Sequence, residues 1–137
     1  MNLLAQWKAI TTRANQAFAH EHYEQACCYY QQAFTLLVQH WPGGNNMMMV
    51  ATGPDIESLV VCLSISAQNL AEAHARRGGH RRCLSLLRRT LQQLSDWHRH
   101  QLLPSEVEEV VLGECSQLWR ELCRQQQMAG QRQAGLH

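Results

Sequence analysis

The sequence predicts an all-α fold of five helices, arranged as two helical hairpins followed by a C-terminal capping helix. Apolar residues recur at helical spacing in five segments, and no segment indicates a strand. The chain has 137 residues, of which 45% are hydrophobic and 17% charged, a composition typical of one compact domain. We expect that domain to cover residues 1–128, and the polar, aperiodic residues 129–137 to form a disordered tail.

The first two helices are predicted to pack against each other as an antiparallel hairpin. Apolar residues recur at alternating intervals of four and three from Leu3 to Ala17, which gives the first helix one buried stripe. The pattern resumes at Tyr23 after a short polar break and ends around His40. So short a connection between two amphipathic helices favours a hairpin.

A long loop is predicted over residues 41–54, where proline and glycine break any helix. The third helix is expected to start at Pro54, because proline tolerates the first helical turn. Asp55 and Glu57 lie beside it, where carboxylates favour the positive end of the helix dipole. The glycine pair that begins at Gly78 is expected to end this helix.

The fourth helix is predicted to begin at His80 and to carry apolar residues as far as Trp97, so that it completes a second hairpin. The fifth helix is expected to start at a capping box. There the Ser105 hydroxyl would cap the first turn, and Glu108, three residues on, would complete the S-x-x-E capping box that satisfies the free amides of that turn. Its apolar stripe continues to Leu122.

Small residues occupy matching positions in the two predicted hairpins, always 57 positions apart. The pairs are Ala14 and Ala71, Ala17 and His74, Ala26 and Cys83, and Ala33 and Thr90. Small side chains at a helix crossing let two backbones approach closely, so this repetition indicates two copies of one structural unit.

These positions resemble the tetratricopeptide repeat family, whose helix-turn-helix unit of about 34 residues has the same order of small and large residues. The resemblance covers residues 7–40 and 64–97, although the proline that ends each unit in the family is missing. The residues that carry it in the first unit are Ala14, Ala17, Tyr23, Ala26, Tyr30 and Ala33. Those of the second unit are Leu70, Ala71, Gly79, Cys83, Leu87 and Thr90.

The resemblance implies a concave groove, lined by the first helix of each unit, that holds an extended peptide or a helix of a partner. The residues that it places on the groove are Lys8, Thr11, Thr12, Asn15, Phe18, Gln68, Asn69, Glu72 and Arg76. Asn15 and Asn69 match asparagines that bind the ligand in peptide-clamping members. The lysines of that clamp are absent, because Thr11 and Val107 stand at their positions, so an acidic C-terminal tail is not the expected ligand there.

Arginine is concentrated in the second hairpin, where six of the twelve basic residues fall within positions 76–89 and no acidic residue interrupts them. The predicted basic stripe consists of Arg77, Arg81, Arg82, Arg88 and Arg89. Such a stripe could hold an acidic protein segment or a phosphate backbone. Alternatively it is a solvated face, paired with acids such as those at positions 106–109. Nucleic acid is the less expected ligand, because the net charge is only +1 and no nucleic-acid motif is present.

Residue types that carry chemistry show no catalytic or metal-binding pattern. The pairs His20/His22 and His98/His100 are two residues apart, so helical side chains there point about 200° away from each other. The cysteines include no C-x-x-C pair, which suits buried thiols in a reducing compartment. We expect no metal, no cofactor and no catalysis.

The apolar segment Met47, Met48 and Met49 lies inside the predicted loop that begins at Trp41. Methionine adapts to irregular surfaces, so the three methionines, together with Trp41, are candidates for an interface with a partner or a second copy of the chain. The alternative is a loop that folds back over hydrophobic helix ends.

Taken together, these patterns predict a cytoplasmic, non-catalytic adaptor or chaperone-like module that binds a protein or peptide partner in its groove. No signal peptide and no apolar run of membrane-spanning length is visible. A short repeat stack leaves hydrophobic ends, so a homodimer is expected. Two alternatives stay open. One is a regulatory protein whose arginine-rich hairpin binds nucleic acid or an acidic partner, and the other is a structural subunit of a larger assembly.

Overall fold

Five α-helices make up the fold in the computed structural model, which describes residues 2–41 and 55–135 and, for 132–135, the backbone only. They are α1 (Leu3–Ala19), α2 (Tyr23–Gln39), α3 (Ile56–Arg76), α4 (His80–His100) and α5 (Ser105–Gly135). No strand occurs in the described ranges. The predicted all-α fold with a C-terminal helix is therefore confirmed.

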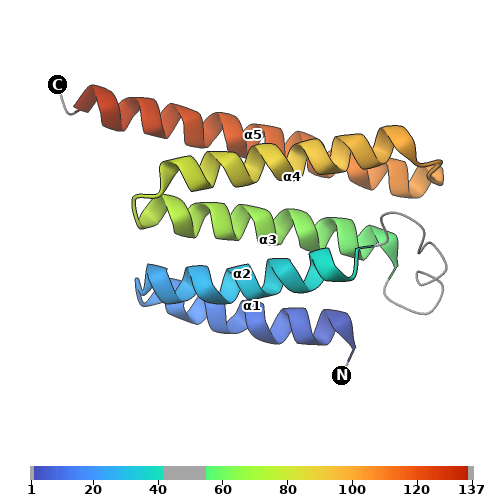
Figure 1. Ribbon diagram of the computed structural model, residues 1–137, viewed down its shortest axis with the longest axis horizontal. Helices are drawn as coiled ribbons and strands as arrows, with labels where there is room; N and C mark the ends of the chain where they lie inside the picture. Colours follow the sequence, from blue (N-terminus) through green and yellow to red (C-terminus); the bar gives the residue numbers. More distant parts are fainter. Residues whose placement is uncertain (1, 42–54, 136–137) are drawn as a thin grey trace.

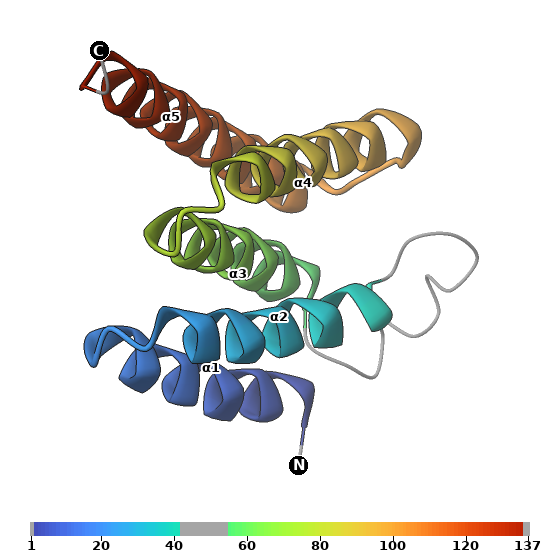
Figure 2. The ribbon, with the colours of Figure 1, turned by 60° about the vertical axis from the view of Figure 1, so that its left-hand side comes forward.

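The helices are stacked in chain order, from α1 at one edge to α5 at the other (Figures 1 and 2). Helix α1 packs on α2, and α3 packs on α4, as the two predicted hairpins require. Helix α2 also packs on α3, which joins the hairpins, while α5 packs on both α3 and α4. No described helix combines the length and the apolar character that a membrane crossing requires.

Polar caps explain where two of the helices begin. The Asn2 side chain accepts a hydrogen bond from the Ala5 amide at 2.7 Å, which fixes the start of α1. Asp55 caps α3 in the same way, because its Oδ1 accepts from the Ser58 amide at 2.6 Å. Helix α3 thus begins one residue after Asp55, whereas the predicted start at Pro54 lies outside the described residues.

Residues in the left-handed backbone region close the two hairpin turns. Gly78 has φ 86° after the C-cap residue Arg77 of α3, and the next amide, of Gly79, donates to the His74 carbonyl oxygen at 2.7 Å. This is the helix end that the glycine pair predicts. In the first hairpin the same role falls to Glu21, with φ 61°, a conformation that non-glycine residues adopt less readily.

The predicted capping box does not form at the start of α5. Ser105 is the first helical residue, and the Glu108 amide donates to the Pro104 carbonyl oxygen at 2.9 Å. The Glu108 carboxylate lies instead 3.6 Å from His98 Nε2 on α4. At its other end α5 continues to Gly135, so the helix extends into the segment that the sequence predicts as a disordered tail.

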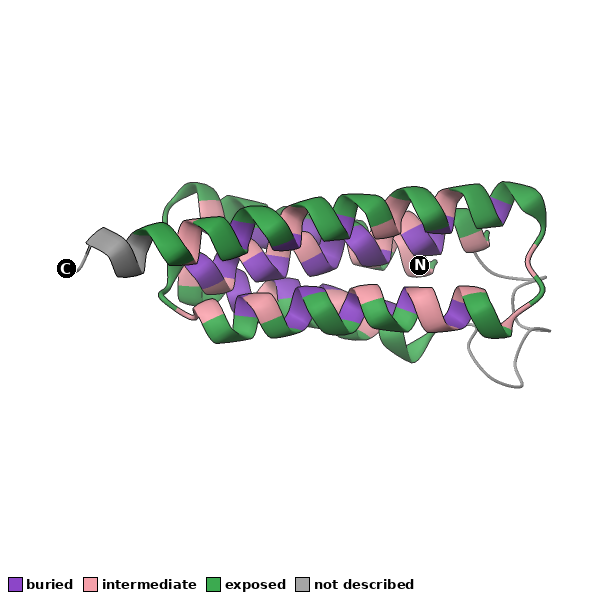
Figure 3. Ribbon diagram, turned by 90° about the horizontal axis from the view of Figure 1, so that it is seen from above, coloured by how far each residue is buried: buried purple, intermediate pink, exposed green. Residues whose placement is uncertain are grey.

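The core lies between the helices, whose outward sides carry the exposed residues (Figure 3). Seven of the eight residues that repeat between the hairpins are small and buried, and the eighth, His74, is larger and half-buried. Its Nδ1 lies 3.7 Å from the Cys27 sulfur of α2. Burial, together with the charges of Arg82 and Arg77, lowers the pKa of His74. The hairpins therefore meet through small side chains and one neutral histidine.

Candidate functional site

The predicted groove residues of α1 are largely engaged within the protein. Thr11 is buried, and the exposed Thr12 donates its hydroxyl to the Lys8 carbonyl oxygen at 2.8 Å. Asn15 Oδ1 accepts a hydrogen bond of 2.5 Å from the hydroxyl of Tyr30 on α2. The amide oxygen that a peptide clamp would present to its ligand is thus held by the neighbouring helix.

The C-terminal ends of α1 and α3 are joined by an aromatic and cationic contact. The Phe18 ring packs edge-on against Tyr23 with 5.1 Å between ring centroids, and the Arg76 guanidinium lies 5.7 Å from the centre of the Phe18 ring. Gln68 donates to a buried serine hydroxyl one turn earlier on α3, at 3.0 Å, and Asn69 is half-buried. The structure therefore brings Phe18 and Arg76 together.

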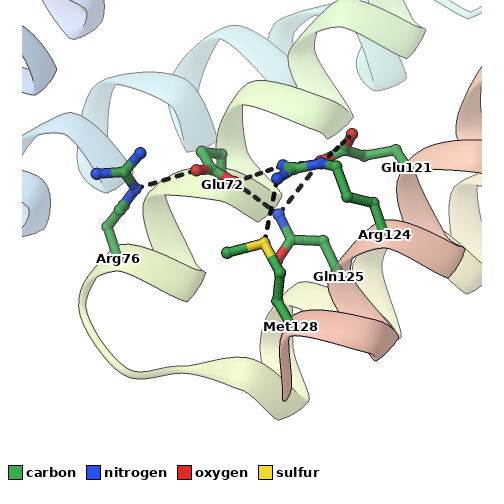
Figure 4. A network of polar contacts seen from close by, with 6 residues as sticks. All are labelled: Glu72, Arg76, Glu121, Arg124, Gln125 and Met128. Carbon is green, nitrogen blue, oxygen red and sulfur yellow. Dashed lines mark hydrogen bonds and ion pairs between the residues drawn. The ribbon is translucent and has the colours of Figure 1, made fainter. Parts of the chain in front are cut away.

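Glu72, the remaining predicted groove residue, is the centre of a polar network between α3 and α5 (Figure 4). Its carboxylate lies 3.0 Å from Arg76 Nε and 3.1 Å from Arg124, and it accepts from Gln125 Nε2 at 2.6 Å. Glu121 also pairs with Arg124 at 2.5 Å. Burial disfavours the charged form of Glu72, but the hydrogen bonds from Arg76 and Gln125 and the charge of Arg124 lower the pKa of this carboxylate. Each charged group of the network thus has an oppositely charged partner within it.

Sequence reasoning missed the α5 half of this network, because it follows the apolar stripe of α5 only as far as Leu122. Gln125 is completely buried. A signal was present, since Gln125 follows Leu118 by seven residues and Leu122 by three, and so continues the apolar stripe of α5. A buried amide at such a position needs hydrogen-bond partners, and Glu72 and Glu121 supply them for Nε2, whereas Oε1 has none among the described residues.

The basic stripe is placed differently from the groove residues, on the solvent side of α4. We call Arg81, Arg82, Arg88 and Arg89 the arginine face; all four are exposed. Within the described parts of the chain, none of these four forms an ion pair, whereas Arg77 lies 3.9 Å from Glu24 of α2. The predicted pairing with acids at positions 106–109 is wrong for Glu108, which pairs with His98.

A cleft opens beside the C-terminal half of α4, at the end of α2. Trp41 and Trp97 meet there edge to face, with ring centroids 5.2 Å apart and planes at 65°. The cleft has a volume of about 430 Å³ and is lined by Val38, Trp41, Leu63, Gln93, Leu94, Asp96 and Trp97. We call it the tryptophan cleft. Of the four predicted interface residues, Trp41 lies here, and Met47, Met48 and Met49 lie outside the described residues.

Among the described thiols and imidazoles, one pair is in contact, Cys27 Sγ with His74 Nδ1 at 3.7 Å. All six cysteines are free, and no three potential ligands among the described histidines, cysteines and acids come together. Burial raises the pKa of Cys83 to about 11 and also raises that of Cys27, Cys62 and Cys115. These four thiols are therefore protonated at neutral pH and are weak nucleophiles.

Fold and surfaces together define an all-helical protein built from two hairpins and a terminal helix, with a cationic face on α4. A family model described as "Protein of unknown function (DUF2753)" matches residues 5–134, and the chain belongs to this family. No curated protein and no solved structure matches the chain. Its function is therefore argued from its surfaces.

Proposed function

We propose that this protein is a non-catalytic binding module that holds an acidic segment of a partner protein on the arginine face. The observation that carries the proposal is the exposure of four guanidinium groups within nine residues of α4, with no acidic partner among the described residues. A guanidinium group presents a planar fork of donors that matches a carboxylate. The four guanidinium groups of this face are therefore available to the carboxylates of a partner.

An acidic protein segment fits this surface better than a nucleic acid does. Outside positions 76–89 the chain carries six basic and eleven acidic residues, so the rest of the chain is net negative. A long phosphate backbone would have to run past those acids, whereas a short acidic segment contacts the arginine face alone. A protein partner also agrees with the adaptor or chaperone-like role that the sequence predicts.

The resemblance to tetratricopeptide repeats supports the general class of module, because the matching small residues lie buried at corresponding helix crossings. The inner groove is the second candidate surface for the same partner. A ligand there would have to compete with the Asn15–Tyr30 hydrogen bond and with the ion pairs of Glu72. For this reason we place the partner on α4.

The proposal is tested with a fluorescently labelled peptide of glutamate and serine, whose binding is followed by anisotropy at low and high salt. The double variant Arg88→Gln/Arg89→Gln should weaken binding about tenfold, and high salt should weaken it for the native protein. The control Arg13→Gln/Arg120→Gln removes the same charge from exposed positions on α1 and α5. Equal losses in both variants would mean unspecific charge attraction and would contradict the proposal.

The groove is tested in parallel by Asn15→Ala and Asn69→Ala. Unchanged peptide binding in these variants supports the arginine face, whereas a loss confined to them transfers the site to the groove. The expected homodimer remains a prediction, which sedimentation velocity of the native chain tests. A structural subunit of a larger assembly would instead not bind the peptide and would associate with a stable protein complex.

A further inference from the structure

Two residues of the arginine face, Arg82 and Arg89, share one edge of α4 with the tryptophan cleft. Arg82, Arg89 and Gln93 are separated by seven and four residues, so they lie on the same side of the helix. Gln93 lines the cleft. A row of side chains therefore runs from the first turn of α4 to the two tryptophans.

This edge of α4 faces α2 and α3. Burial lowers the pKa of His74 on α3, and the charge of Arg82 lowers it further, so Arg82 is within electrostatic reach of this side chain. The same charge works against the burial that raises the pKa of Cys27 on α2. At the other end of the row, Val38 of α2 and Leu63 of α3 line the cleft opposite Gln93. A ligand that follows the row thus ends at the cleft.

The cleft itself has the chemistry of a site for an apolar side chain. Val38 is 45% exposed although it lies at the cleft, so its apolar surface has no complete cover among the described residues. The two tryptophan rings, inclined at 65° to each other, offer both an edge and a face to a third ring. The carboxylate at the rim, Asp96, is already bonded by Gln92 and Arg99 and does not demand a cation from the ligand.

We propose that the tryptophan cleft takes one aromatic side chain of the acidic segment that the arginine face binds. This inference rests on the proposed function and adds a second specificity element to it. Aromatic rings bury a large apolar area in a well-packed pocket and often dominate binding energy there. The arginine face then attracts the segment, and the cleft selects it.

Distances along α4 set the spacing of the expected motif. Arg89 precedes Trp97 by eight residues, which is about 12 Å along a helix. An extended peptide covers about 3.3 Å per residue. An acidic residue about four positions from the aromatic one therefore meets Arg89, and acids further along the same direction approach Arg82.

Two labelled peptides test the inference. The first contains glutamate and serine with one phenylalanine four positions from a glutamate, and the second has alanine in place of the phenylalanine. We expect the first to bind the native protein about tenfold more tightly. Because this advantage comes from apolar contact, it should persist at high salt, where both affinities fall.

The cleft variant is Val38→Gln, which removes an exposed apolar wall and leaves the buried core intact. It should abolish the advantage of the phenylalanine peptide and leave the alanine peptide unaffected. The matched control is Leu112→Gln, because Leu112 is similarly exposed, at 48%, but lies on α5. The control should preserve the advantage.

Tryptophan fluorescence gives a second readout, since neither peptide contains tryptophan. Binding of the phenylalanine peptide should change the emission of the native protein, and Trp41→Phe should remove most of that change. Equal affinity of the two peptides would overturn the cleft assignment while the proposed function stands. Binding of both peptides that is insensitive to Arg88→Gln/Arg89→Gln would overturn the proposed function, and the inference with it.

Discussion

Trp7 and Ser66 are joined by a hydrogen bond of 2.7 Å, in which the indole N–H of α1 donates to the hydroxyl oxygen of α3. The two residues are 59 positions apart, and Ser66 is only 2% exposed. A buried hydroxyl needs a hydrogen-bond partner, so this bond fixes how the first helices of the two hairpins lie against each other. It is the α1 counterpart of the link that Glu72 makes from α3 to α5.

Removal of this bond should lower the free energy of unfolding. Trp7→Phe keeps most of the ring but loses the donor, so we expect a loss of about 1–3 kcal/mol in urea titrations. Ser66→Ala should have a similar effect, and the double variant should cost less than the sum of the two, because both remove the same bond. Trp119→Phe is the control, since Trp119 is 56% exposed. Additive losses would show that the bond contributes no stability.

The Glu72 network predicts a specific dependence of stability on pH. The pKa of the Glu72 carboxylate is lowered in the folded state, because the effect of burial is outweighed by the hydrogen bonds from Arg76 and Gln125 and by the Arg124 charge. The stabilisation is therefore complete above the ordinary pKa of 4.5 and is lost as the pH falls through the lowered folded value. Glu72→Gln should reduce stability by about 2 kcal/mol at neutral pH. It should also flatten the acid limb of the stability curve.

A matched carboxylate provides the control for that experiment. Glu109→Gln removes an exposed acid from α5, with no ion pair among the described residues. It should change stability at neutral pH little and keep the slope in acid. If both variants have the same acid limb, Glu72 does not supply the pH dependence.

The proximity of Arg82 to His74 predicts a measurable coupling. Burial and the charges of Arg82 and Arg77 hold the pKa of His74 below its ordinary value of 6.5. Arg82→Gln should raise it, as NMR titration of the imidazole protons would show, whereas Arg88→Gln should change it less. Since the unfolded chain takes up this proton first, stability falls as the pH drops below 6.5, and Arg82→Gln should reduce that fall. Equal shifts in the two variants would contradict the placement of Arg82.

Thiol reactivity should follow exposure. Cys28 and Cys123 are exposed, whereas Cys27 and Cys83 are buried with raised pKa values. In the folded protein, a maleimide reagent should therefore modify Cys28 and Cys123 first, as peptide mass spectrometry would show. The variant Cys28→Ser/Cys123→Ser should lose the fast phase. Rapid labelling of Cys83 would mean that the second hairpin opens readily.

Much of the fold follows from local spacing in the sequence. Ala14 and Ala71 lie at equivalent helix crossings because only small side chains permit the close approach, and this requirement is visible as a repeat. Gly78 ends α3 because its left-handed conformation suits glycine. Such features depend on neighbours within a turn or on helix periodicity, and both can be read directly.

The candidate sites depend on pairings between distant residues, which spacing alone does not determine. Asn15 is exposed on α1, and nothing in its neighbourhood indicates that Tyr30 would hold its amide oxygen. Trp41 and Trp97 belong to segments that the sequence treats as a loop and a helix end, and only the stacking of α2, α3 and α4 brings their rings together. The arginine face was predictable because all its members lie on one helix.

The position of α3 has a consequence for how the molecule unfolds. It packs against α2, α4 and α5, and it is bonded to α1 through Ser66. A linear array whose repeats touch only their neighbours can lose its terminal units one at a time. Here the removal of either end exposes the same central helix, so we expect the five helices to unfold as one cooperative unit in a single transition.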